Sequence, residues 1–449
     1  MLRMRWVGGV FKIAMVGLLA VSCGEGGGAV PTGGPVGGTP SVGGGGGAGG
    51  VGSGQIDTTF GQAGGTITPI ASSGGGDVAN AVAIQTDGKI VLAGYSENNV
   101  NTGKTDFAVV RYNTNGSLDS TFDGDGKATT FTQDTLPADG FGDTNAIANA
   151  VAIQPDGKIV AAGSSDGDFA LIRYHANGTL DSAFGSNGIV VTAATSGVDE
   201  IRAMALQPSD GKLLVAGESN GDFVVARYNT NGTPDATFAG NGIVVTPMAG
   251  RNGLYALVLQ PDGKVVVAGV SDGNFALARY SAAGLLDVTF DSDGIADGGP
   301  GQANAIALQA DGKIVVGGYV NTGGQSDFAL LRFGSTGAAD FSFGTLGKVV
   351  TSFGGSDAEI NGLAIDPTSG KIVAAGFTFT GVDPDFALVG YTAGGILDVT
   401  FGDTGRVVTP ISQFDDEAKA IALQTNGKVV VAGSADADFV VARYDALGL

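Results

Sequence analysis

Residues 154–184 read QPDGKIVAAGSSDGDFALIRYHANGTLDSAF, and variants of this stretch occur seven times between residues 80 and 444. Each copy has two apolar runs around a turn that ends in Gly-Lys, then Phe-Ala-Leu-x-Arg-Tyr and Leu-Asp-x-Thr-Phe elements. The turn lysines are Lys89, Lys158, Lys212, Lys264, Lys313, Lys371 and Lys428, so successive copies are 49 to 69 residues apart. Repeats of this length are typical of propellers and solenoids.

Four strand-length runs make up each copy. In the fourth copy they are residues 242–246, 255–260, 264–269 and 274–280. Pro261-Asp262-Gly263 joins the middle two, and Asp-Gly between apolar runs favours a hairpin because glycine accepts a positive φ. Four strands per unit predict one propeller blade. The expected fold is therefore all-β: a seven-bladed β-propeller of four-stranded antiparallel blades, with a solenoid as the alternative.

The two ends of the repeat region favour a closed ring. The last copy stops at residues 445–449, where its Leu-Asp-x-Thr-Phe element should begin, and the matching element, residues 56–60, precedes the first blade. We therefore predict that residues 55–60 lie beside residues 445–449, so that the N- and C-terminal segments close the ring. We expect the phenylalanine of each element to fill the space between neighbouring blades: Phe60, Phe122, Phe184, Phe238, Phe290, Phe343 and Phe401.

The N-terminal 54 residues differ from the repeats. Residues 1–22 have basic residues and a short apolar run, which is typical of an export signal and too short to span a membrane. Residues 19–23 resemble a bacterial lipobox, although the leucine stands four residues before Cys23 rather than three. We predict a lipoprotein-type signal peptide at 1–22, lipidation of Cys23, a glycine-rich flexible tether at 23–54 with a reach of about 30 Å, and the propeller at 55–449. The protein is then exported and lipid-anchored to the bacterial cell envelope; simple secretion is the alternative.

Composition excludes several classes of function. The chain has 23 basic and 44 acidic residues, and without Arg3, Arg5 and Lys12 its formal charge is 20 − 44 = −24. Such a surface repels phosphate backbones, so nucleic acid is not an expected partner. Cys23 and His175 are the only cysteine and histidine, which argues against a disulfide, a Cys-based zinc site and Ser-His-Asp or Cys-His catalysis. His175 stands in a repeated polar turn, so we do not expect it to act as a general base.

Two charged positions recur with the blades. The Leu-Asp aspartates and the turn lysines should lie at the same end of the ring, and we expect them to pair and set blade geometry, each exposed pair contributing about 0 to 1 kcal/mol. A ring of ligand-binding lysines is the alternative. An arginine recurs before an aromatic residue, but the sixth blade has Gly390 there. Because one blade does without it, we expect the arginine to support the edge of the blade rather than to act in catalysis. The aspartates are Asp57, Asp119, Asp181, Asp235, Asp287, Asp340 and Asp398, and the arginines are Arg111, Arg173, Arg227, Arg279, Arg332 and Arg443.

Residues 123–126 and 291–294 read Asp-x-Asp-Gly and resemble the start of a calcium loop. They lack the following glutamate, and the sister copies at 185–188 and 239–242 read Gly-Ser-Asn-Gly and Ala-Gly-Asn-Gly. Turn formation explains all four copies. We therefore predict no metal or cofactor, with calcium as the alternative.

The combination of residues 154–163, 168–171, 173–174, 178–181 and 184–185 closely resembles the bacterial delta-60 repeat family, over roughly residues 55–449. The resemblance implies an exported β-propeller-like repeat protein without an established activity. Ser369 and Asn426 replace the turn aspartate, and Gly390 replaces the arginine; these departures weaken single copies only.

Insertions that the repeat does not need stand at 131–146, 95–106, 319–327 and 377–385, all expected at one end of the ring. Because function often lies on such loops, we predict that this face binds a protein or glycan ligand, with neutral drift of these loops as the alternative. No copy contains an evident unique acid pair, so the protein is expected to be a monomeric, non-enzymatic binding module. A polysaccharide hydrolase or lyase, or a purely structural envelope protein, is the alternative.

Overall fold

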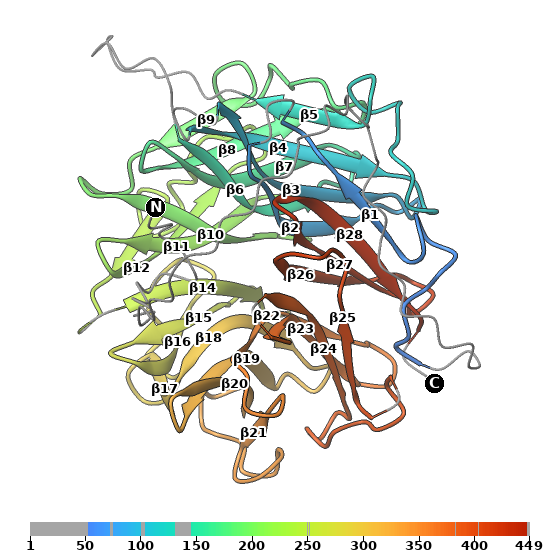
Figure 1. Ribbon diagram of the computed structural model, residues 1–449. Helices are drawn as coiled ribbons and strands as arrows, with labels where there is room; N and C mark the ends of the chain where they lie inside the picture. Colours follow the sequence, from blue (N-terminus) through green and yellow to red (C-terminus); the bar gives the residue numbers. More distant parts are fainter. Residues whose placement is uncertain are drawn as a thin grey trace, which may run out of the picture. The chain divides into compact units, whose positions relative to one another are not determined.

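The computed structural model describes residues 53–71, 75–99, 104–130, 145–248, 250, 252–381, 383–402 and 404–446. Seven four-stranded antiparallel sheets form a seven-bladed β-propeller (Figure 1), which confirms the predicted fold. The predicted signal peptide, Cys23 and nearly all of the predicted tether lie outside the described residues. Within the described residues, no helix is long and apolar enough to cross a membrane.

The innermost strand of each blade lies against the innermost strands of its neighbours. From the centre outward, the blades are β2 (Asp77–Ile84), β3 (Ile90–Asn99), β4 (Lys104–Tyr112), β5 (Lys127–Thr130); β6 (Ala146–Ile153), β7 (Ile159–Ser165), β8 (Asp168–Tyr174), β9 (Ile189–Thr192); β10 (Asp199–Leu206), β11 (Leu213–Ser219), β12 (Asp222–Tyr228), β13 (Ile243–Thr246); β14 (Asn252–Leu259), β15 (Val265–Ser271), β16 (Asn274–Tyr280), β17 (Ile295–Pro300); β18 (Gln302–Leu308), β19 (Ile314–Thr322), β20 (Gln325–Phe333), β21 (Lys348–Thr351); β22 (Ala358–Ile365), β23 (Ile372–Phe379), β24 (Pro384–Tyr391), β25 (Arg406–Thr409); and β26 (Asp416–Leu423), β27 (Val429–Ala435), β28 (Asp438–Tyr444), β1 (Gly65–Thr68).

The grouping of runs into blades differs from the prediction at one strand. The run at 242–246 forms β13, which pairs with β12 of the preceding blade and not with β14. The cause is the Leu-Asp-x-Thr-Phe turn, which reverses the chain tightly after β12, whereas the connection after β13 crosses to the next blade. Assigning residues 242–246 to the same blade as 255–280 was therefore wrong.

Both ends of the chain build the seventh blade. Strand β1 pairs with β28 from Gly65 opposite Ala442 to Thr68 opposite Phe439, and Figure 1 shows the blue β1 beside the red β28. A second contact lies just past the end of β28, where Asp445 N donates to Gln55 O at 2.7 Å. The predicted closure by the terminal segments is thus confirmed, although residues 447–449 lie outside the described residues.

Apolar side chains between adjacent blades form the core. Phe122 is fully buried and packs in one cluster with Val91 of the first blade and Ile159 of the second, as predicted for this phenylalanine. Burying such a ring is worth about 2 kcal/mol. A polar contact adds to the joint, because Tyr174 Oη lies 2.8 Å from Thr130 Oγ1 of the preceding blade.

Candidate functional site

The repeated lysines and aspartates meet at one end of the ring, which we call the lysine end. Lys89 Nζ lies 2.9 Å from Asp119 Oδ2, and Lys428 Nζ lies 2.6 Å from Asp57 Oδ2. The other five pairs, at 2.8 to 3.2 Å, are Lys158–Asp181, Lys212–Asp235, Lys264–Asp287, Lys313–Asp340 and Lys371–Asp398. The pairing is as predicted, but the description as exposed pairs was wrong: the aspartate side chains are only 3 to 16% exposed.

The recurring arginine connects this network to the next blade. Arg227 Nε donates to Asp235 Oδ2 at 2.7 Å, and its Nη1 donates to Ala282 O of the fourth blade at 2.8 Å. The same guanidinium lies over the Phe238 ring, 4.8 Å from its centre. Equivalent contacts surround Arg111, Arg173, Arg279, Arg332 and Arg443. The arginines therefore lock neighbouring blades together.

The repeated aspartates are held ionised. Burial raises the pKa of Asp119, but hydrogen bonds from Thr121 and Lys89 and the charge of Arg111 outweigh it, so this pKa lies well below its usual range. The pKa moves in the same direction at Asp57, Asp181, Asp235, Asp287, Asp340 and Asp398. Strongly ionised, fully engaged carboxylates suit structural support better than proton transfer.

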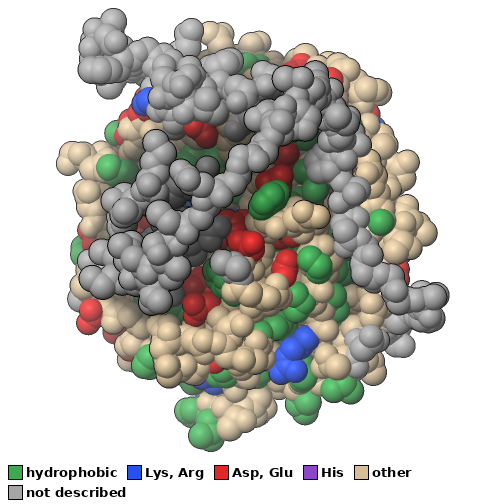
Figure 2. Space-filling view, in the orientation of Figure 1, with side chains coloured by type: hydrophobic (Ala, Val, Ile, Leu, Met, Phe, Trp, Pro, Cys, Tyr) green, Lys and Arg blue, Asp and Glu red, His purple; other side chains and the backbone are tan. Residues whose placement is uncertain are grey.

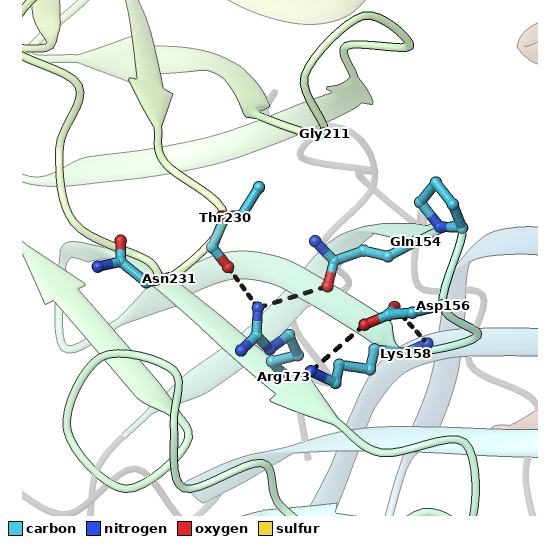
Figure 3. A pocket seen from close by; sticks show the side chains of 8 residues that line it. Gln154, Asp156, Lys158, Arg173, Gly211, Thr230 and Asn231 are labelled. Atoms are coloured by element: carbon cyan, nitrogen blue, oxygen red, sulfur yellow. Dashed lines mark hydrogen bonds and ion pairs between the residues drawn. The ribbon is translucent and has the colours of Figure 1, made fainter.

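A cleft of about 370 Å³ lies where the second and third blades meet at the lysine end (Figure 3). Its polar groups bind one another: Lys158 Nζ lies 3.3 Å from Asp156, and Arg173 donates to Gln154 Oε1 at 3.5 Å and to Thr230 O. A similar cleft of about 420 Å³ lies between the fifth and sixth blades. Because this geometry recurs with the repeat, we interpret these clefts as joints between blades.

The sixth blade lacks the arginine at the place where the chain ends meet. A Cβ at Gly390 would lie 2.5 Å from Phe401 Cβ, so no side chain fits there. Beside it, Gly402 N donates to Ser53 O at 2.7 Å, whereas the equivalent Gly185 N donates to Asn231 in the following blade. The departure of Gly390 therefore coincides with the junction that the N-terminal segment completes.

The remaining predicted candidates lie in ordinary turns. Asp125 Oδ1 accepts a hydrogen bond from Lys127 N at 2.9 Å, and Asp293 accepts the same bond from Ile295 N. Across the described part of the chain, no three His, Cys, Asp or Glu side chains converge as metal ligands. His175 is half-exposed, with Nε2 3.7 Å from Asp181 Oδ1.

The opposite end of the ring, which we call the hairpin end, has extended hairpins at three places where loops were predicted. Residues 95–106, 319–327 and 377–385 were expected as loops, but their strands continue, with Tyr95 paired to Phe107, Tyr319 to Phe328 and Phe377 to Phe386. In the fifth blade the tip is Gly323-Gly324, and the positive φ of both glycines (66° and 100°) suits a tight hairpin. The predicted insertion at 131–146 falls outside the described residues except for Asn145 and Ala146.

Each innermost strand has a β-bulge at the same position, which brings one side chain per blade to the centre. Asn80 Nδ2 donates to Ala148 O at 3.0 Å, and Asn149 Nδ2 donates to Glu200 Oε1 at 2.9 Å, so these side chains bridge neighbouring inner strands. The bulged residues are Asn80, Asn149, Arg202, Tyr255, Asn304, Asn361 and Lys419.

Every glutamate in the described residues lies on the two inner strands of a blade, near their hairpin ends. Glu200, Glu359 and Glu417 each stand two positions before the bulge; Glu218 lies opposite Glu200; and Glu97 accepts a hydrogen bond from Gly76 N at 3.1 Å. We call these five residues the glutamate mouth. Figure 2 shows acidic side chains gathered near the centre of the face in view.

Two cations and three tyrosines accompany the glutamate mouth. Arg202 Nη2 lies 2.8 Å from Glu200 and 3.1 Å from Glu218, and Lys419 pairs with Glu417. Burial, and then the charge of Glu359, raise the pKa of Tyr319 to about 12. Burial and neighbouring glutamates also raise the pKa of Tyr95 and Tyr255. Burial is thus the main cause at all three tyrosines, and the nearby glutamate charges act in the same direction.

Sequence reasoning missed the glutamate mouth, because its members come from five different strands. A signal was present: aligning the seven inner strands places Glu200, Glu359 and Glu417 in one column, beside Val78, Ile147, Gly253 and Gln302. The acid is therefore not required by the fold.

Comparison with known proteins agrees with the fold. The family model described as "Domain of unknown function (DUF5122) beta-propeller" matches residues 85–122, 154–184, 209–238, 260–290, 309–343 and 424–448. Among solved structures, the chain matches Sqt1 from Chaetomium thermophilum bound to the N-terminus of ribosomal protein L10 (13% identity, TM-score 0.46, covering 85% of this chain and 100% of that one). Another is Drosophila Plexin A in complex with Semaphorin 1b (10% identity, TM-score 0.44, 88% of each chain). No curated protein matches.

Proposed function

We propose that this chain is an exported propeller of the delta-60 type, anchored to the bacterial envelope through Cys23, which binds a lysine- or arginine-rich peptide at the glutamate mouth. The single observation that supports the site is that Glu97, Glu200, Glu218, Glu359 and Glu417 all lie on the two inner strands of their blades, near the hairpin end. The repeated residues make the blades alike, whereas these glutamates are confined to some of them.

The chemistry of the mouth suits a cationic ligand. Five carboxylates stand against two cations, Arg202 and Lys419, so negative charge is in excess there. Carboxylates grouped at an opening raise the local concentration of cations and speed their association. Tyrosine faces add cation–π attraction, and Arg202 already lies 5.9 Å from the centre of the Tyr255 ring.

A binding titration tests this site. The ring of residues 40–449 forms one compact unit that contains all the closing contacts, and a fluorescent oligoarginine serves as the probe. The variant E200Q/E359Q/E417Q should weaken binding at least about tenfold and lower its salt dependence. The control D87N/D156N/D262N removes the same charge at the lysine end and should change affinity by less than about twofold. Equal losses in both variants would show attraction to net charge alone and contradict a site at the mouth.

The anchor is tested separately in the full chain. In a bacterial host, Cys23→Ser should abolish incorporation of labelled fatty acid and move the protein from the membrane to the soluble fraction. Retained label in the variant, or a soluble unmodified parent chain, would contradict lipidation at Cys23.

A polysaccharide hydrolase or lyase is the second candidate, because Glu200 and Glu218 are cross-strand partners and burial raises the pKa of Glu200. A glycosidase of this kind needs one protonated and one ionised carboxyl group. Arg202 contacts both carboxylates, and its charge opposes the effect of burial on the pKa of Glu200, so we assign the pair to binding. Release of reducing sugar that E200Q and E218Q both abolish would favour the enzyme instead.

A further inference from the structure

The turns of the fifth and sixth blades expose four large apolar side chains at the lysine end. Phe341 is 70%, Leu346 77%, Ile396 69% and Val399 64% exposed. We call these four residues the apolar rim. Phe341 and Leu346 share one Leu-Asp-x-Thr-Phe turn, and Ile396 and Val399 share the next. The two turns are in direct contact, because Gly344 N donates to Gly394 O at 3.0 Å.

The repeat provides an internal control for the apolar rim. Where Phe341 and Val399 stand, the first two blades have Ser120 and Ser182. Where Ile396 stands, the second and third blades have Thr179 and Thr233. The fourth blade is apolar at both positions, with Val288 61% and Leu285 63% exposed. All these turns adopt the same hydrogen-bonded geometry, so the fold does not require apolar residues there.

Leu346 is in addition unfavourable for its own backbone. Its φ is 56°, and the equivalent residue of the second blade is Asn187, with φ 54°. Asparagine tolerates this left-handed region well, whereas leucine does so poorly. An exposed leucine at such a position costs stability without packing in return, which argues that an external contact favours it.

The N-terminal segment joins the ring beside this rim. Gly402, three residues after Val399, donates to Ser53 O at 2.7 Å, and Gly54 lies so close to the Phe401 ring that a Cβ there would be 2.4 Å from it. Ser53 and Gly54, the first described residues, are therefore held at the same turn that carries Val399.

We propose that the apolar rim inserts into the interfacial layer of a lipid bilayer and orients the ring with its lysine end toward the membrane. The orientation rests on the proposed anchor at Cys23, whereas the contact itself does not. Short exposed apolar turns bind bilayers in proportion to the apolar area that they bury. The charged neighbours in these turns do not oppose insertion, because Asp340 pairs with Lys313 and Arg332, and Asp398 with Lys371. Bilayer contact at this end leaves the glutamate mouth facing away from the membrane.

A second copy of the chain is the less favoured occupant. A formal charge of 20 − 44 = −24 without the signal residues makes two rings repel each other. A zwitterionic bilayer has no such net repulsion.

Flotation with phosphatidylcholine vesicles tests the contact on the ring of residues 40–449, which lacks Cys23. The variant F341S/L346N/I396T/V399S installs residues that sister blades carry, so it should fold as well as the parent, and L346N should raise stability. We expect its partitioning to fall at least about tenfold. The matched control V198T/F414S removes exposed apolar side chains at the hairpin end, 68% and 58% exposed, and should float like the parent.

Each other outcome overturns the proposal in a distinct way. A parent ring that does not float, or a rim variant that floats equally, refutes insertion. Light scattering that shows a dimeric parent and a monomeric rim variant assigns the surface to a second copy. The flotation result does not depend on lipidation, because the ring of residues 40–449 lacks Cys23. The anchor and the apolar rim are therefore tested independently.

Discussion

Arg443 and Asp57 stand 386 positions apart in the sequence, and Arg443 Nε donates a 2.7 Å hydrogen bond to Asp57 Oδ2. In the first blade the equivalent residues, Arg111 and Asp119, are 8 positions apart and 2.7 Å from each other. The same contact thus serves as a local turn in one blade and as the clasp between the chain ends in another.

Asp57→Ala should destabilise the ring by about 3 kcal/mol, because it leaves Arg443 without its carboxylate and Lys428 with only Asp445, 3.4 Å away. It should also speed amide hydrogen exchange in β1. Asp181→Ala removes matching contacts within one blade and should cost a similar free energy while leaving β1 exchange unchanged. Equal β1 exchange in the two variants would contradict the special role of the clasp.

Gly390→Ala should lower stability by about 2 kcal/mol, since the added Cβ meets Phe401 Cβ at 2.5 Å in a packed joint. Urea unfolding measures the loss. The control is Gly394→Ala, four residues along, where the nearest atom lies 3.9 Å away. An unchanged free energy of unfolding in Gly390→Ala would show that the junction accommodates the added Cβ without cost.

Asp438→Asn should stabilise the ring at neutral pH. Burial and the charges of Asp77 and Asp436 raise the pKa of Asp438 to about 6, so ionising this carboxyl costs more in the folded than in the unfolded chain. The penalty is absent below about pH 4, grows as pH rises toward 6, and is complete above it. Because the group is partly exposed, we expect a gain of only about 1 kcal/mol at pH 7 and none at pH 4. Thermal unfolding at both pH values measures it; equal gains would point to a cause other than titration.

Acid should weaken the ring progressively. The seven repeated aspartates have lowered pKa values in the fold, so their stabilising contribution is present above about pH 4 and is lost as pH falls below that. The free energy of unfolding should therefore decline from pH 4 to pH 2. Asp119→Asn should start from lower stability and show a shallower decline. A free energy that stays constant down to pH 2 contradicts the assignment.

The sequence was sufficient for features that depend on local repetition. The hairpin at Asp262-Gly263, the lysine–aspartate pairs and the closure all follow from residues that recur at fixed offsets. The partner of β13 could not be read in this way, because an apolar run of five residues does not show which neighbouring strand it joins.

Features that depend on convergence could not be predicted. Glu200, Glu359 and Glu417 lie around one opening only because the ring places their three inner strands about a common centre. The tip of the hairpin at Tyr319 to Asp327 is rich in glycine and polar residues, a composition that is also typical of loops, although its strands remain paired. The apolar rim becomes visible only when exposure is compared between blades.

The position of β1 in the seventh blade has a consequence for folding during synthesis. A chain emerging N-terminus first presents residues 65–68 long before residues 439–442 can pair with them. Until β28 arrives, the nascent protein has an unpartnered strand at its leading end and an open sheet edge at its trailing end, both able to pair with other chains. Pairing of β28 with β1 is thus the step that closes the ring, and a copy truncated before β28 should be the form that aggregates or is degraded.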